Sequence, residues 1–201
     1  FWFLPWVKKL VRKSEQPVMR ISSHTLDAIT ASDVQINILL SQASQKSSAT
    51  WVDLWQFHNG SATFAGIPFI KMSITHEYNV DGYEPRGPRY QSMPIGLFAN
   101  SLFDINKNGF IEVLVGDTPY KTIEAAYIFD KVANGAFFRI GNANNNMVGI
   151  LSISYSTRFC MTPDVLEGMK GFAARMAVSL GVLAEQRRVD RDSRHSEDVI
   201  V

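Results

Sequence analysis

Residues 50–60 read TWVDLWQFHNG, in which Trp51, Asp53, Trp55 and Phe57 occupy every second position and an Asn-Gly pair follows. Side chains two apart share one face of an extended chain, so the stretch predicts a β-strand. Asn59-Gly60 tolerates positive φ and predicts a turn at the end of that strand. Residues 67–78, IPFIKMSITHEY, predict a second strand. The two stretches together indicate a hairpin.

Further strands and helices alternate downstream of this hairpin. Residues 81–92, DGYEPRGPRYQS, contain two Pro and two Gly and predict a loop. We expect helices over 93–105 and 122–132, and strands over 110–115, 135–141 and 147–156. The tight turn between the last two strands is expected at residues 141–144.

Two longer helices bracket these elements. Apolar residues recur at three- and four-residue intervals after Ser22 and Ser23, either of which can cap the first helix. A second such pattern follows Thr162-Pro163, where threonine is the expected N-cap and proline the first helical residue. A strip of small residues lies on another face of this helix: Gly168, Gly171, Ala174, Val178 and Gly181. The second helix can therefore pack on its own domain and on a partner.

This order of elements resembles the GAF family of ligand-binding and signalling domains over about residues 22–188. The resemblance is carried by WQFHNG at 55–60, by Ser73-Ile74-Thr75, and by the late pair GAFFRIG and VGILS. It implies an α/β (α+β) fold with a central antiparallel sheet of five or six strands. The long terminal helices would pack on one face, and shorter helices and loops would cover the other. PAS domains share this general layout.

The best-known GAF chemistries lack their motifs in this sequence. Cys160 has no neighbouring histidine, as the cysteine that holds a bilin would have, and an NKFDE-type motif of the cyclic-nucleotide-binding members is absent. The methionine-sulfoxide-reducing members use several cysteines. We therefore expect no cofactor.

Composition excludes several classes of protein. Twenty basic and 19 acidic residues give a net charge of +1, which does not favour nucleic acid. A single cysteine rules out an intrachain disulfide and a multi-cysteine metal site, and it is compatible with a reducing compartment.

The two ends of the sequence differ from the middle. Residues 1–21 are expected to form an arm that contacts a partner or the end of a membrane anchor, because aromatic residues precede a basic cluster there. The residues assigned to that contact are Phe1, Trp2, Phe3, Trp6, Lys8, Lys9, Arg12 and Lys13. Residues 189–201 are expected to be a polar tail. The expected location is the cytoplasmic side of a membrane or a larger assembly.

The candidate ligand site joins the ends of the hairpin strands to the 81–91 loop. Its residues are His58, Asn59, Thr75, Glu77, Arg86 and Arg89. The loop would cover a pocket on the sheet or form an interaction surface. Two arginines flanked by tyrosines suit an anionic ligand or a protein partner, and they also suit simple exposure to solvent.

The sequence contains no complete motif for a metal site or a catalytic site. Asp104, Asn106 and Asn108, with Gly109, match the start of a calcium-binding loop. Position 12 of that loop is Val115 where a bidentate glutamate belongs, so a helix-to-strand turn is the expected structure. His58 and His76 lack a third ligand at a matching interval. A hydrolase built on His58 and Ser73 has no supporting motif.

We therefore expect a non-enzymatic GAF-like domain with one of two roles. The first is a structural or assembly module, tethered through its N-terminus and oligomerising through its terminal helices. The alternative is a regulatory domain that senses a small molecule under the 81–91 loop.

Overall fold

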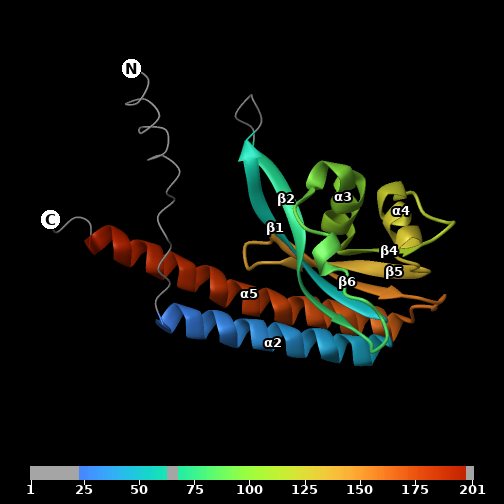
Figure 1. The fold of residues 1–201 in the computed structure, drawn as a ribbon, viewed down its shortest axis with the longest axis horizontal. Coiled ribbons are helices and arrows are strands. Elements are labelled where there is room, and N and C mark those ends of the chain that lie inside the picture. The colour runs from blue at the N-terminus through green and yellow to red at the C-terminus, as the bar shows by residue number, and fades with distance from the viewer. Residues whose placement is uncertain (1–22, 63–67, 198–201) are drawn as a thin grey trace, which may run out of the picture.

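The computed structural model describes residues 23–62 and 68–197 of the 201-residue chain. They form one six-stranded antiparallel sheet in the order β3-β2-β1-β6-β5-β4 (Figure 1). The strands are β1 (Trp51–Ala62), β2 (Pro68–Asn79), β3 (Met93–Pro94), β4 (Phe110–Leu114), β5 (Asn134–Gly141) and β6 (Met147–Tyr155). The helices are α2 (Ser23–Ser47), α3 (Ala99–Asn108), α4 (Lys121–Phe129) and α5 (Pro163–Glu197). The predicted α+β class is confirmed.

The sheet separates two apolar cores. Helices α2 and α5 lie side by side along one face, and α3 and α4 cover the other (Figure 1). Strand β1 serves both cores because its side chains alternate between the faces. Val52 and Leu54 pack with the long helices, whereas Trp51 and Trp55 pack with α3 and α4. Asp53 therefore points to the α3 and α4 face, whose core is mainly apolar.

The two long helices run antiparallel and are joined at one end. Lys46, in the last turn of α2, donates a hydrogen bond to Asp164 in the first turn of α5. The amide of Val165 donates to the Thr162 hydroxyl, which confirms the expected N-cap. Helix α5 continues to Glu197, past residue 188, where the domain was expected to end. The division of the chain into an arm, a domain and a tail stays a prediction.

Two predicted boundaries were wrong. Asn59-Gly60 does not turn the chain, because β1 continues to Ala62 with Asn59 opposite Ile70. Pairing with β2 overrides the local turn preference, and the irregularity appears only as a register shift between Asn59 and Ala62. Residues 93–105 are not one helix: β3 and a 3₁₀ turn at Ile95–Phe98 precede α3. Pro94 favours extended backbone before it and cannot donate within a helix.

The calcium-like stretch is the end of a helix. Residues 104–108 form the last turns of α3, and Gly109 caps the helix with φ +84°. Asp104 accepts a hydrogen bond from the Tyr120 hydroxyl at 2.9 Å, and Asn106 accepts one from Arg139 Nε at 3.0 Å. In the described part of the chain, no group of three or more His, Cys, Asp or Glu residues is placed to hold a metal ion.

Candidate functional site

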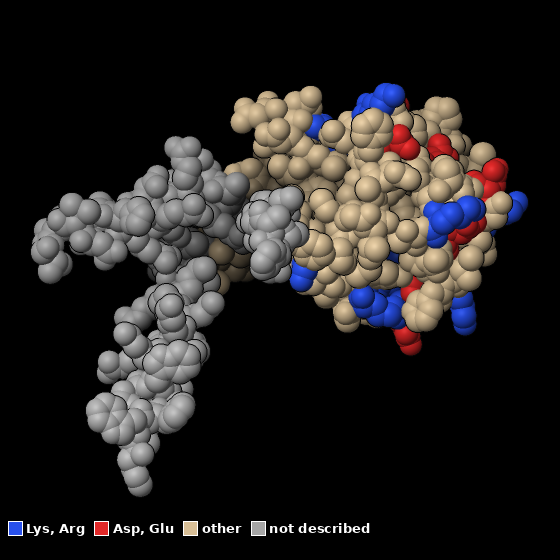
Figure 2. Space-filling view, turned by 90° about the horizontal axis from the view of Figure 1, so that it is seen from above, with Lys and Arg blue, Asp and Glu red and all other residues tan. Residues whose placement is uncertain are grey.

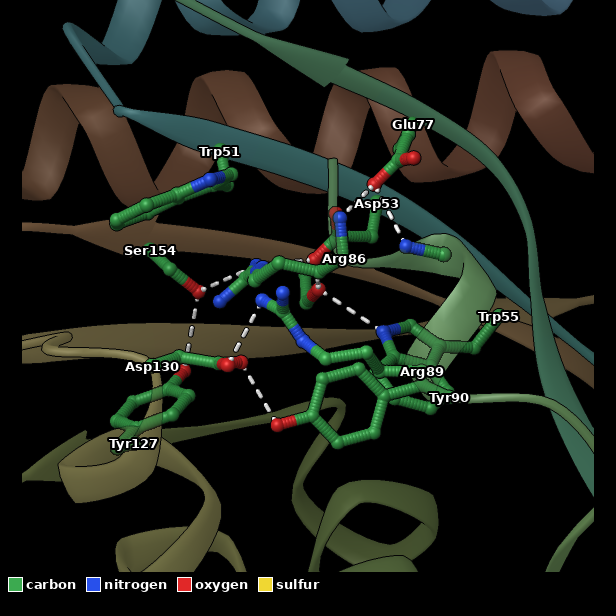
Figure 3. A network of polar contacts seen from close by, with 12 residues as sticks. Trp51, Asp53, Trp55, Glu77, Arg86, Arg89, Tyr90, Tyr127, Asp130 and Ser154 are labelled. Atoms are coloured by element: carbon green, nitrogen blue, oxygen red, sulfur yellow. Dashed lines mark hydrogen bonds and ion pairs between the residues drawn. The ribbon is translucent and has the colours of Figure 1, made fainter. Parts of the chain in front are cut away.

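A buried ion pair lies at the centre of the α3 and α4 face of the sheet (Figure 3). Arg86, from the 81–91 loop, places Nη2 2.5 Å from Oδ2 of Asp53 on β1. The Asp53 side chain is 1% exposed and that of Arg86 is 4% exposed. The Arg86 guanidinium also lies 4.8 Å from the Trp51 ring centroid. A loop residue and a central-strand residue are thus joined inside the protein.

Hydroxyl groups on β6 connect this pair to the aromatic side chains around it. Trp55 donates its indole N–H to Ser152 at 3.0 Å, and Ser152 donates its hydroxyl to Asp53 Oδ2 at 2.9 Å. Ser154 lies 3.4 Å from Arg86 Nη2 and 3.3 Å from the Tyr127 hydroxyl. Antiparallel pairing explains the arrangement, because Asp53 stands opposite Ser152 in the register of β1 and β6.

A cavity of about 40 Å³ lies against the ion pair. Its lining combines apolar side chains with a few polar groups: Asp53, Trp55, Met72, Arg86, Tyr90, Phe98, Ser101, Leu102, Ile105, Ile123, Ala126, Tyr127, Asp130, Phe137, Ile150, Ser152 and Ser154. Two buried polar atoms, Asp53 Oδ1 and Arg86 Nε, have no hydrogen-bond partner among the described residues. A few convergent polar groups in an apolar cavity are typical of a ligand site.

Side chains hold the 81–91 loop over the cavity at two places, residues 86–87 and residues 89–90. Glu77 Oε2, at the end of β2, accepts hydrogen bonds from the amides of Arg86 at 2.7 Å and Gly87 at 2.9 Å (Figure 3). Asp130 accepts one bond from Arg89 at 2.9 Å and one from the Tyr90 hydroxyl at 2.7 Å. The loop is therefore fixed by side chains of β2 and of the residue that follows α4.

Burial shifts the pKa values of the central groups. Burial raises the pKa of the Asp53 carboxyl above its usual value, although Arg86 and Ser152 oppose the change. Burial acts to lower the pKa of Arg86, but the fields of Asp53 and its neighbours outweigh it, so the net shift is upward. The pKa values of Tyr90 and Tyr127 are also raised by burial. Asp53 thus depends on its positive neighbour to remain ionised.

The structure brings together part of the predicted ligand site. Arg86 lines the cavity and Asp53 holds it inside, so simple exposure to solvent, one of the alternatives for the loop arginines, does not apply to it. Arg89 is half-exposed, and its partner Asp130 lines the cavity. Glu77 anchors the loop. Thr75 lies outside the cavity lining and donates to the Leu54 carbonyl at 3.4 Å.

His58 forms a separate pair. Its Nε2 lies 2.9 Å from the Ser73 hydroxyl, which also accepts the Ser92 amide at 2.8 Å. Ser73 is buried, and neither residue lines the cavity, so the pair serves to hold the chain after the loop against β2. The side chain of Asn59 and the residues assigned to membrane or partner contact lie outside what the structure describes.

Sequence reasoning missed most of the cavity lining, above all Asp53. The signal was present in TWVDLWQFH, where Asp53 is the one ionisable side chain among the apolar members of its alternation. A charge at a core-facing position needs a partner. Asp130 and Ser152 carried no comparable signal, because both occur in segments with ordinary polar spacing.

The surface carries mixed charge. Basic and acidic side chains are interspersed on the rounded part of the molecule seen in Figure 2. In the part of the chain that the structure describes, no helix is both long and apolar enough to cross a membrane.

No protein-family model and no curated protein matches the sequence. Solved structures do match. The GAF domain of PixJ from Thermosynechococcus elongatus, in its blue-light absorbing form, is 12% identical with a TM-score of 0.63, over 85% of this chain and 96% of that one. A far-red cyanobacteriochrome photoreceptor is 9% identical with a TM-score of 0.61, over 89% of this chain and 97% of that one.

A third solved structure is the GAF domain region of a Geobacter sulfurreducens protein. It is 12% identical with a TM-score of 0.56, over 80% of this chain and 99% of that one. Identities this low bear on the fold alone. Taken with the six-stranded sheet and the paired terminal helices, the matches show that this chain has a GAF-like fold.

Proposed function

We propose that this chain is a regulatory domain that binds a small molecule beneath the 81–91 loop and passes the loop's displacement to its terminal helices. The observation that carries the proposal is the buried Asp53–Arg86 pair at the wall of an apolar cavity. A buried ion pair is a weak source of stability, because desolvation offsets much of the attraction. Its position between a fixed strand and a loop suits a binding site.

The cavity is too small for a drug-sized ligand, which indicates a closed conformation. A volume of about 40 Å³ admits little more than ordered water, whereas sites for drug-sized ligands measure roughly 300–1,000 Å³. Ligand binding therefore requires the loop to withdraw Arg86 and Tyr90 from the lining. The conformation described is the closed one.

Strand β2 supports a route from the loop to the helices. Glu77 holds the loop on one face of the sheet. The adjacent residue, His76, places Nε2 3.1 Å from Asp33 Oδ1 on α2. A loop movement that releases Glu77 thus acts on a strand that is bonded directly to a terminal helix. Some solved neighbours are photoreceptors, which accords with a sensory role.

A thermal-shift screen of a metabolite library tests the proposal. Compounds that raise the unfolding temperature of the wild-type protein should lose their effect in Ala126→Phe, which fills the cavity lining. They should keep it in Asp27→Asn, an exposed position on α2. Native mass spectrometry of the purified protein should show a retained molecule. An empty protein with no cavity-dependent compound in the library would refute the proposal.

Assembly is the second candidate function, and one observation favours it. Leu26, Val34 and Ile38 on α2 are about half-exposed, and Val34 and Ile38 lie one helical turn apart and form an exposed apolar patch. Such a patch suits a partner helix. Sedimentation of the wild-type protein should show self-association that Val34→Glu/Ile38→Glu removes. A wild-type protein that stays monomeric at high concentration would oppose this role. Tethering through residues 1–21 stays a prediction.

A further inference from the structure

Asp53 is the fixed half of the buried pair. It lies on β1, which is paired with β2 on one side and β6 on the other. Arg86 is the half that can leave, because the 81–91 loop connects β2 to β3 at the edge of the sheet. Any opening of the cavity therefore leaves the Asp53 carboxylate in place.

The geometry of the pair is incomplete on both sides. Arg86 reaches Asp53 through Nη2 alone, while Asp53 Oδ1 and Arg86 Nε have no partner among the described residues. A guanidinium facing a carboxylate squarely makes two parallel hydrogen bonds and uses both carboxylate oxygens. A free guanidinium that is not constrained by the loop backbone could satisfy Oδ1 and Oδ2 together.

The charged side chains around the cavity favour a cationic ligand over an anionic one. Two buried carboxylates, Asp53 and Asp130, line it, with side chains 1% and 2% exposed. Arg86 is the buried cation of that lining, and Arg89 is half-exposed and engaged with Asp130. Withdrawing Arg86 leaves Asp53 uncompensated in a low dielectric, which is strongly unfavourable. An anionic ligand would add to that cost, whereas a cationic ligand removes it.

The walls of the cavity suit a planar cation. Trp55, Tyr90, Tyr127 and Phe137 line it, and aromatic faces attract guanidinium groups. The protein already uses this interaction where Arg86 lies over Trp51.

We infer that the ligand is a small guanidinium compound with an apolar body, which replaces the Arg86 side chain at Asp53. Arg86 is then a built-in competitor that occupies the site in the closed conformation. This inference rests on the proposed function, since it names the ligand class of that same cavity.

The probe for this inference is n-propylguanidine, which copies the Arg86 side chain from its β carbon outward. The neutral n-propylurea and the anionic sodium butyrate serve as controls. Binding is followed in the wild-type protein by the indole N–H resonances of Trp55, which bonds Ser152, and Trp51, which bonds the Glu84 carbonyl. We expect saturable shifts of both resonances with the guanidine and none with the urea or the carboxylate.

Variants test separately whether Arg86 competes with the ligand and whether the charge of Asp53 attracts it. Arg86→Met removes the internal competitor, so its affinity for n-propylguanidine should rise at least tenfold. Asp53→Asn should lower that affinity at least tenfold. Arg175→Met, an exposed position on α5, should leave it unchanged. If Arg86→Met is too unstable to study alone, millimolar n-propylguanidine should raise its unfolding midpoint more than n-propylurea does.

The possible negative results distinguish failure of the guanidinium inference from failure of the proposed function. Equal binding of the urea, preferred binding of the carboxylate, or full affinity in Asp53→Asn would overturn the guanidinium inference. If the metabolite screen still gives cavity-dependent compounds of another class, the proposed function stands and the inference alone falls. If no compound of any class depends on the cavity, both fall.

Discussion

Substitutions of Asp53 and of Arg86 should affect the stability of the protein in different ways. Loss of Arg86 leaves a carboxylate with a raised pKa inside the protein, and that carboxyl can take up a proton. Loss of Asp53 leaves a guanidinium, which does not deprotonate in a protein but can follow its loop into solvent. The penalty for losing Arg86 is therefore the one that depends on pH.

Arg86→Met should lower the free energy of unfolding by about 3–5 kcal/mol at pH 8, because it leaves a buried charge unpaired. The unfolded carboxyl titrates near pH 4, and the folded pKa lies above that value. The contribution of the Asp53 carboxyl to stability is thus fully present below pH 4 and is lost as the pH rises through its folded pKa. The deficit relative to wild type should be smaller at pH 5 than at pH 8.

Urea unfolding of both proteins at the two pH values measures that difference. Arg175→Met, which changes an exposed charge on the opposite face of the sheet, should cost less than about 1 kcal/mol at either pH. A deficit for Arg86→Met that is equally small at pH 8 would contradict the account of the pair.

Glu77 should decide how firmly the loop is closed. Glu77→Ala removes an acceptor of two amide hydrogen bonds, so the Arg86 and Gly87 amides should exchange with solvent at least tenfold faster. Glu77→Gln keeps one carbonyl oxygen in that place, and both bonds use a single oxygen. It should restore most of the protection. Exchange in Glu77→Ala that stays at the wild-type rate would show that Glu77 does not hold the loop.

Strand β5 passes close to β6 and α4 at Gly135. A β carbon there would lie 2.4 Å from both the Ile153 carbonyl oxygen and the Tyr127 hydroxyl. Gly135→Ala should therefore cost about 1–3 kcal/mol through overpacking. Gly171→Ala, on α5 with open space around it, should be neutral or stabilise the protein by up to about 1 kcal/mol. Thermal unfolding compares the two, and equal midpoints would contradict the close approach.

The elements that sequence analysis predicted well are those with strong local signals. The seam of α5, its Thr162-Pro163 start and the apolar runs of β5 and β6 each carry their own pattern, so they could be located without tertiary information. The β1 extension past Asn59-Gly60 could not be located, because pairing with β2 produces it. The burial of Arg86 depends on Asp53, 33 residues away.

The sheet separates the face with the cavity from the face covered by the long helices α2 and α5. The two cores share the six strands, and His76 and Glu77 are neighbours on β2 that bond to opposite sides. In the proposed function, a signal from the cavity would reach α2 directly through this strand.

His76→Ala should weaken that connection without emptying the site. Ligand affinity should change less than about threefold, since His76 does not line the cavity. The ligand-dependent change in hydrogen exchange along α2 should shrink in the variant, whereas the change in the 81–91 loop should persist. An undiminished response of α2 would place the coupling elsewhere.

Binding of a small molecule beneath the 81–91 loop is open to direct measurement. The most direct measurement is a ¹H–¹⁵N spectrum of the tryptophan indoles, recorded while a compound retained by the protein or found in the metabolite screen is added. Trp55 reports on the cavity through Ser152, and Trp51 reports on the loop through the Glu84 carbonyl. We predict saturable shifts of both resonances at the same midpoint. Resonances that stay in place while the compound binds would contradict binding beneath the loop.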